Sequence, residues 1–187
     1  MNKKQQLNSI AREIEACALC KQHASGKPVP GEGNENALIV FIGEAPGKTE
    51  AKTGRPFVGR SGKLLRNMIT TMLHLNEKDV YITSPVKYLP DSGTPDTATI
   101  LHGKTHLEKQ LGIINPKIIV IMGATAAKAL VTERIQIAKD HGKTIEKNGK
   151  LYFLTVHPAA AIRFSKYKSI IENDFKKLQN LLDTASM

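Results

Sequence analysis

At 187 residues, with 41% hydrophobic and 24% charged residues, the chain has the length of one domain, and its apolar content excludes a disordered protein. It contains neither an apolar run of the roughly 20 residues that a membrane span needs nor a secretory-type leader, so we expect a cytoplasmic monomer folded as a single domain over residues 1–187. The excess of 27 Lys and Arg over 17 Asp and Glu gives a net charge of +10, which favours a polyanionic partner such as nucleic acid over an inert basic surface.

The predicted elements alternate along the chain between helices and short apolar strands. An amphipathic helix is expected first, over residues 4–16, followed by a Gly/Pro-rich connection. Apolar runs then have the composition of buried strands: residues 37–42, 80–83, 117–122 and 151–156. Helical periodicity between and after them predicts further helices: residues 62–75, residues 104–114, an Ala-rich helix opened by Gly123, and residues 166–182.

Strands that alternate with helices predict a parallel sheet that is covered on both faces. We therefore predict an α/β fold, a three-layer α/β/α sandwich around a central four-stranded parallel sheet. In such sheets the ligand crevice lies outside the carboxyl ends of the strands. Functional residues are expected in the turns that begin there: Gly43, Ser84, Gly123 and His157.

Two of these turns carry distinctive motifs. The first reads GEAPGKTEAKTGRPFVGRSGKLL, from Gly43 to Leu65, and the last reads VHPAAAIRF, with His157 at the end of a strand. Each motif alone is weak, because a Gly/Pro-rich loop or a single histidine is usually structural. Together, in this order and with VYITSPVK between them, they resemble the uracil-DNA glycosylase superfamily, and in particular its family 4.

This resemblance implies an enzyme that flips one nucleotide out of DNA and hydrolyses its N-glycosidic bond without cutting the strand. Phe57 would stack on the extruded base, and Glu44 would line the pocket near the base edge. His157 would donate a hydrogen bond to the pyrimidine O2, where negative charge builds up as the bond breaks. Glu50 is the best remaining carboxylate for the water or the sugar cation, because Ala45 stands where some related families carry an Asp.

The resemblance also implies contacts to the base and to the DNA backbone. Small residues would complete the base pocket beside Phe57: Gly43, Ala45, Gly47 and Ser84. Basic, hydroxyl and small residues would hold phosphates and flanking nucleotides: Arg60, Ser61, Gly62, Lys63, Lys87, Gly123, Thr125, Arg163 and Lys166. Ile162 is the candidate side chain that wedges into the duplex, because Ala161 replaces the family's Leu.

Two positions point away from strict recognition of uracil. Ser84 replaces the Asn whose amide reads the uracil edge, and Gly47 leaves space where other families place a bulky group against the pyrimidine C5. We therefore favour a modified pyrimidine, such as a 5-hydroxymethylated or glucosylated base of phage DNA, whose excision would leave abasic sites in antiviral defence. The alternatives are plain uracil excision in base excision repair and a catalytically inactive protein that binds modified DNA. An unrelated phosphate-binding α/β enzyme is disfavoured, because the sequence lacks both common nucleotide-binding signatures.

Family 4 enzymes hold an iron–sulfur cluster with four cysteines, whereas this chain has two, Cys17 and Cys20. Tyr88 and either His102 or Gly103 stand at the other two positions, so we expect neither an iron–sulfur cluster nor a required cofactor. The alternative is a structural zinc ion, with the following ligands: Cys17, Cys20, His102 and His106.

Overall fold

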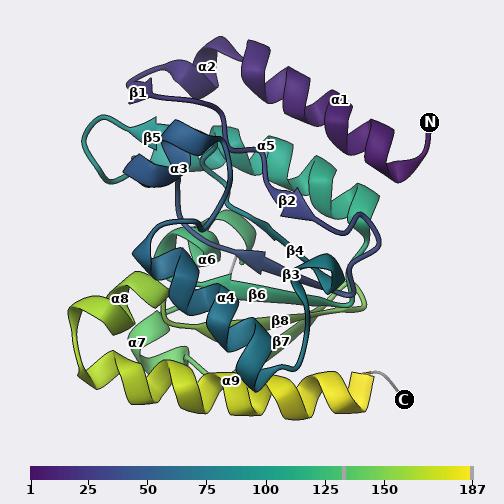
Figure 1. Cartoon of the computed structure of the whole chain (residues 1–187), viewed down its shortest axis with the longest axis vertical. Coiled ribbons are helices and arrows are strands. Elements are labelled where there is room, and N and C mark those ends of the chain that lie inside the picture. Colours follow the sequence, from purple (N-terminus) through teal and green to yellow (C-terminus); the bar gives the residue numbers. More distant parts are fainter. Residues whose placement is uncertain (132–133, 186–187) are drawn as a thin grey trace.

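The structure, a computed structural model, describes residues 1–131 and 134–185. Its centre is a six-stranded sheet with the order β2-β4-β3-β6-β8-β7 (Figure 1). The strands are β2 (Glu32–Gly33), β3 (Ile39–Ile42), β4 (Val80–Thr83), β6 (Ile118–Met122), β7 (Thr144–Lys147) and β8 (Lys150–Thr155). The four inner strands are parallel, and β2 and β7 are antiparallel edges. The predicted α/β sandwich around four parallel strands is therefore confirmed.

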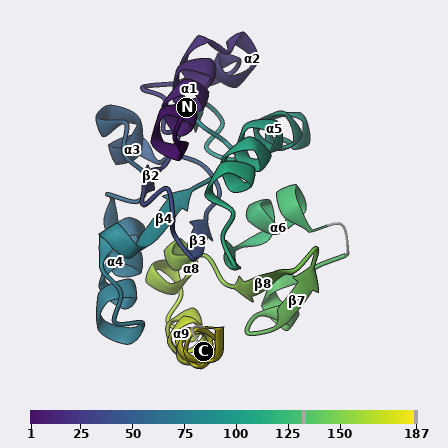
Figure 2. The same ribbon diagram turned by 90° about the vertical axis from the view of Figure 1, so that its right-hand side faces the viewer.

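Helices cover both faces of this sheet (Figures 1 and 2). One face packs against α1 (Lys3–Ala16), α5 (Thr97–Ile114) and α6 (Ala124–Leu130), and the other against α4 (Arg60–Met72), α8 (Pro158–Arg163) and α9 (Lys166–Ala185). The central strands β3 and β6 are apolar throughout because both of their faces are buried. Val40 and Ile42 of β3 pack on the α5 side, whereas Phe41 packs on the α9 side, 6.3 Å from the ring of Phe175.

Several short elements were not predicted from the sequence. They are α2 (Ala18–Lys21), α3 (Lys48–Thr53), η1 (Glu77–Asp79), α7 (Ile137–Asp140) and α8, together with the edge strands β2 and β7 and the small pair β1 (Ala24–Ser25) and β5 (Leu89–Pro90). β7 is only half-buried, so it lacks an apolar run, and it joins β8 through Asn148 and Gly149, both with positive φ. Helix α5 begins seven residues before its predicted start, because Asp96 caps it by accepting from the Thr99 N–H.

The carboxyl ends of the four parallel strands lie along one edge of the sheet. The chain leaves them at Gly43, Ser84, Gly123 and Val156, so the four predicted functional turns lie along one edge. Among the described residues, no helix combines the length and the apolar character that crossing a membrane requires.

Candidate active site

A pocket of about 440 Å³ opens at this edge of the sheet. Most of the residues predicted to touch the base or the reacting atoms line it: Glu44, Ala45, Gly47, Glu50, Phe57, Ser84 and His157, with Ser61 beside them. Lys48 and Gly93 also line it and were not predicted. Lys48 begins α3 within the first motif, and Gly93 follows the unpredicted strand β5.

His157 is held by the first turn of α8. Its Nδ1 accepts a hydrogen bond from the backbone N–H of Ala159 at 3.1 Å. A ring nitrogen that accepts carries no proton, so the neutral ring has its proton on Nε2. Burial lowers the pKa of His157 and outweighs the opposing effect of Glu44. The ring is therefore neutral near pH 7, and its free Nε2–H is a hydrogen-bond donor.

Phe57 lies beside His157, with the two ring centroids 5.7 Å apart. Its backbone is left-handed, with φ of 52°, which is a strained conformation for a bulky residue. Two glycines make room for it: a Cβ on Gly43 would lie 2.4 Å from the Phe57 ring, and one on Gly62 would lie 2.0 Å from the Phe57 backbone. Gly62 is buried under this residue, so the expectation that it contacts DNA is wrong.

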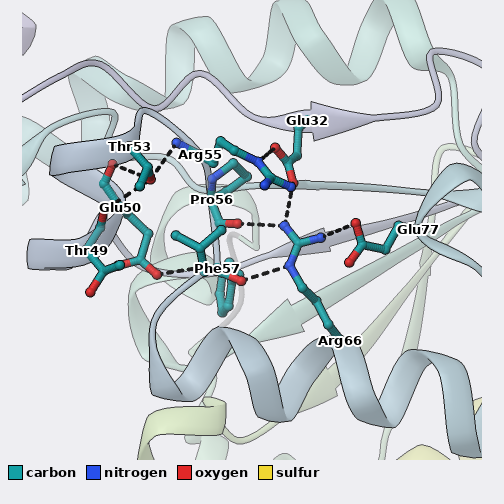
Figure 3. A network of polar contacts seen from close by, with 10 residues as sticks. Glu32, Thr49, Glu50, Thr53, Arg55, Pro56, Phe57, Arg66 and Glu77 are labelled. Atoms are coloured by element: carbon teal, nitrogen blue, oxygen red, sulfur yellow. Dashed lines mark hydrogen bonds and ion pairs between the residues drawn. The ribbon is translucent and has the colours of Figure 1, made fainter.

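Arg66 holds the strained segment from below (Figure 3). Its Nε donates to the Phe57 carbonyl oxygen at 2.9 Å, and its Nη2 donates to the Pro56 carbonyl oxygen at 2.8 Å. The same guanidinium pairs with Glu32 and Glu77. Burial alone would raise the pKa of Glu32, but its hydrogen bonds to Arg55 and Arg66 hold the pKa below its usual value. No sequence pattern pointed to Arg66, because its partners lie beyond its own helix, 9 to 34 residues away in the chain.

Glu50 fixes the same segment from the pocket side. Its Oε1 accepts from the backbone N–H groups of Val58 at 2.9 Å and Gly59 at 2.7 Å. Its Oε2 lies 2.7 Å from the position that a Cβ on Gly47 would occupy. The expectation that Gly47 leaves pocket space for a larger base is therefore wrong, because the carboxylate of Glu50 fills that space.

Glu44 is oriented by a residue expected to bind DNA. Thr125 Oγ1 donates to Glu44 Oε2 at 2.7 Å, so its only hydroxyl proton is not available to a phosphate. The N–H of Gly123 donates to the Thr155 carbonyl oxygen at 3.0 Å and is likewise engaged. The predicted DNA contact of Thr125 is therefore wrong, because Thr125 instead positions a carboxylate in the pocket. The contact of the half-exposed Gly123 with DNA stays a prediction, without a role for its N–H.

Comparison of the sequence with known proteins identifies the family. The family model described as the uracil DNA glycosylase superfamily matches residues 30–181 of the chain. This chain belongs to the uracil-DNA glycosylase superfamily. Membership makes it a DNA glycosylase, an enzyme that hydrolyses N-glycosidic bonds.

Relatives in this superfamily align over most of the chain. A type-4 uracil-DNA glycosylase of Sulfurisphaera tokodaii is 39% identical, over 95% of this chain and 86% of the relative. Type-4 uracil-DNA glycosylases of Archaeoglobus fulgidus and Thermotoga maritima are 38% and 35% identical, over 94% and 92% of this chain and 92% and 93% of their own lengths. The resemblance to family 4 is therefore confirmed.

Ser84 stands where the resemblance to the family predicts an Asn. It is buried at the pocket, and its Oγ donates to the Val86 carbonyl oxygen at 2.7 Å. Because its proton is engaged there, the hydroxyl can offer a bound base only its lone pairs.

Lys87 does not reach the surface of the glycosylase. It is only 2% exposed, and its Nζ donates to three acceptors: Gln110 Oε1 at 2.7 Å, Thr83 Oγ1 at 2.8 Å and the Pro30 carbonyl oxygen at 3.2 Å. Burial lowers its pKa to about 7. The expectation that Lys87 contacts DNA is wrong, because its ammonium group joins β4 to α5 inside the protein.

The remaining predicted DNA-binding residues are exposed around the pocket. Arg60 and Lys63 lie on the first turn of α4, and Ile162, Arg163 and Lys166 lie at the junction of α8 and α9. Because α4 and α8 pack against each other, these two groups flank the pocket from neighbouring helices. Phe164, which was not predicted, is 49% exposed at the same junction, with the Arg163 guanidinium 5.5 Å from its ring centroid.

Proposed function

We propose that this DNA glycosylase removes uracil from DNA in base excision repair. The observation that carries the proposal is the neutral His157, whose Nε2–H faces the same pocket as the Phe57 ring. The names of the type-4 relatives support uracil as the substrate. A DNA substrate supports the cytoplasmic location expected from the sequence.

In the proposed reaction, the uracil ring stacks on Phe57 after the nucleotide leaves the duplex. The bond between C1′ of the sugar and N1 of the base breaks, and its electron pair leaves with the base. The Nε2–H of His157 stabilises the negative charge that develops on O2. Water then adds to C1′, and the proton that it loses is balanced by the proton that the uracil anion takes up from solvent, which leaves free uracil and an abasic site.

Glu44 is the carboxylate we assign to the sugar side of this reaction. Its Oε2 is fixed by Thr125, which leaves its Oε1 to orient the water or to face the positive charge on the sugar. Glu50 is a positioning residue in this proposal, because both amides that it holds belong to the segment that carries Phe57. The role expected for Glu50 at the reacting atoms thus passes to Glu44.

The hydroxyl of Ser84 supports a preference for uracil over cytosine. It can only accept a hydrogen bond from a base, because its proton is on the Val86 carbonyl oxygen. Uracil carries a proton on N3 and cytosine carries a lone pair there. An acceptor that faces N3 disfavours cytosine and would replace part of what an Asn amide reads.

A modified pyrimidine is the second candidate substrate. Ser84 is smaller than the Asn of the family motif, and this smaller side chain favours a modified base. Glu50, however, fills the space above Gly47, so the other argument for a larger base no longer holds. A role in antiviral defence depends on this second candidate alone.

Binding of DNA would use the exposed residues that flank the pocket. Arg60, Lys63, Arg163 and Lys166 supply the positive charge for phosphates on both sides of the flipped nucleotide. Ile162 and Phe164 are the exposed apolar side chains that could fill the gap left in the duplex, and the larger Phe164 is the better candidate.

Single-turnover excision from matched duplexes at one salt concentration tests the proposal. The duplexes carry uracil, cytosine, 5-hydroxymethyluracil, 5-hydroxymethylcytosine or its glucosylated form. We expect uracil to be released fastest. Faster release of a 5-substituted base would reject uracil in favour of the second candidate, and no release from any duplex would indicate an inactive binding protein.

The variant Ser84→Ala separates recognition by the hydroxyl from general pocket shape. It should reduce the preference for uracil over cytosine by about 5- to 150-fold, the range of one polar contact, while the exposed Ser9→Ala serves as the control. An unchanged ratio would remove Ser84 from base recognition.

A further inference from the structure

Four potential metal ligands meet outside the pocket, between the end of α1, the short helix α2 and helix α5. Ligand atoms of Cys17, Cys20, His102 and His106 all lie within 4.8 Å of one another. Cys17 Sγ lies 3.1 Å from His102 Nε2. None of the four residues lines the active-site pocket, so the glycosylase chemistry does not account for them.

Each half of this cluster is preorganised by local structure. His102 and His106 lie on consecutive turns of α5, four residues apart, and therefore on one face of the helix. Cys17 ends α1 and caps α2, and its Sγ accepts a hydrogen bond from the Cys20 N–H at 3.4 Å. The two cysteines thus form a compact Cys-x-x-Cys turn that faces the two histidines.

His106 gives the independent sign of a missing ligand. It is only 3% exposed, yet neither ring nitrogen has a hydrogen-bond partner among the described residues. Buried imidazoles normally have a partner, and an unmet one costs about 1–3 kcal/mol. The nearest charged group is Glu13 Oε1, 3.5 Å from His106 Nδ1 and already paired with Lys109. Nε2 is left to bind a metal, with Nδ1 facing a carboxylate as in many metal-bound histidines.

The four-cysteine cluster of family 4 does not fit these residues. The sequence has only two cysteines. Tyr88, at the third position, is buried next to Cys20. A Cβ on Gly103 would lie 2.1 Å from the Pro85 carbonyl oxygen, so this position has no room for a cysteine.

The spacing instead fits one ion. Zn²⁺ binds thiolates at about 2.3 Å, so two ligands of one ion lie at most about 4.6 Å apart. The four ligand atoms here, all within 4.8 Å of one another, need only small side-chain movements to reach one ion. A cluster inserts several irons and bridging sulfides between its ligands, which lie further apart. Two thiolates and two imidazoles are a usual tetrahedral set for Zn²⁺ and leave no coordination position open for chemistry.

We propose that Cys17, Cys20, His102 and His106 bind one structural zinc ion in place of the family's iron–sulfur cluster. The ion ties the α1–α2 segment to α5. Glu13 positions His106 through its Nδ1.

Element analysis of untagged protein, purified without added metal or chelator, is the first test. We expect one zinc per chain and no acid-labile sulfide. Cobalt(II) should replace zinc and give the absorption bands of a tetrahedral ion with thiolate ligands. Iron with acid-labile sulfide would overturn the proposal, and so would a metal-free protein that binds neither zinc nor cobalt(II) in a titration.

Variants then assign the ligands. His102 is partly exposed, so His102→Ala should still fold. Its zinc affinity should fall by about 10²-fold or more, because changes to the residues that merely contact metal ligands already lower metal affinity by up to about 100-fold. Cys17→Ser should behave in the same way. The exposed His74→Asn, whose left-handed backbone suits Asn, is the matched control and should keep its zinc. Full zinc occupancy in His102→Ala and Cys17→Ser would overturn the assignment.

Two further measurements separate the metal site from the active site. Glu13→Gln should weaken zinc binding by about 10- to 100-fold, with Glu15→Gln on the same helix as its control. Removal of zinc by a chelator should lower the unfolding temperature of the wild type and leave that of Cys17→Ser unchanged. An unchanged wild-type unfolding temperature would overturn the structural role, whatever the excision assays show.

Discussion

The Nε of Arg66 donates to the carbonyl oxygen of Phe57 at 2.9 Å, and this bond ties a helix to the strained residue on which the extruded base would stack. Phe57 has a left-handed backbone, and it packs against Gly43 and Gly62, where any side chain would clash with it. Such strain persists only where the surroundings over-determine it, and here Arg66 and Glu50 fix the segment from opposite sides.

Arg66→Lys should therefore lower both stability and activity. Lysine cannot hold the Phe57 and Pro56 carbonyls while pairing with two carboxylates, and hydrogen bonds from a charged group contribute about 1.5–3 kcal/mol each. We expect the free energy of unfolding to fall by about 2–3 kcal/mol and single-turnover excision to fall about tenfold.

Chemical denaturation and rapid-quench assays measure the two effects of Arg66→Lys. Arg55→Lys is the control, because Arg55 pairs with the same Glu32 but is mostly exposed. Equal behaviour of the two variants would show that the Arg66 contacts to the loop are unimportant.

His157→Ala should lower single-turnover excision by about 10²-fold, the loss typical of one donor to a developing anion, with little change in binding to an uncleavable duplex. An unaltered rate would remove His157 from the mechanism.

The pH dependence of His157 follows from its environment. Burial lowers its pKa below the ordinary 6.5, so the unfolded chain takes up this proton at higher pH than the folded protein. Its contribution to stability is therefore complete above pH 6.5 and is lost as the pH falls through the folded pKa. An NMR titration of the ring should give a midpoint below 6.5, and a midpoint above 6.5 would contradict the buried neutral ring.

Thr125→Val should impair Glu44 without unfolding the protein. The side chains have similar size, but Val cannot donate to Glu44 Oε2, so the carboxylate loses its fixed orientation. We expect about a tenfold lower single-turnover rate, unchanged affinity for DNA, and recovery in Thr125→Ser, which keeps the hydroxyl. A parallel loss of DNA affinity would instead restore Thr125 as a DNA-binding residue.

Lys87 and Arg163 should give opposite phenotypes. Lys87→Met removes the donor that Gln110 Oε1 and Thr83 Oγ1 share, whereas the Pro30 carbonyl oxygen still accepts from Thr83 and Gln110. This variant should destabilise the protein by about 1–3 kcal/mol, with no change in the salt dependence of DNA binding. Arg163→Ala should leave stability unchanged and reduce the slope of log K against log salt by about one. A reduced slope in Lys87→Met would place that side chain at the DNA after all.

The sequence alone determined the sheet and the position of the pocket. Fully apolar runs such as residues 37–42 and 117–122 can be satisfied only between two layers of helices, which orders four parallel strands. Because the carboxyl ends of parallel strands share one edge, the motifs around Glu44, Phe57 and His157 had to meet there. Helix α8 escaped prediction because it has only six residues, and β7 because its outer side chains face solvent.

Only the tertiary structure decided which polar residues face the ligand and which hold the protein together. Lys87 and Thr125 have the residue types of a DNA contact, but their partners, Gln110 and Glu44, lie 23 and 81 residues away in the chain. From the sequence, Gly47 predicts open space in the pocket, but in the structure the carboxylate of Glu50 occupies that space. The apolar pattern that determines the fold is visible among residues that are neighbours in the sequence. A hydrogen bond instead depends on where the donor and the acceptor lie in three dimensions.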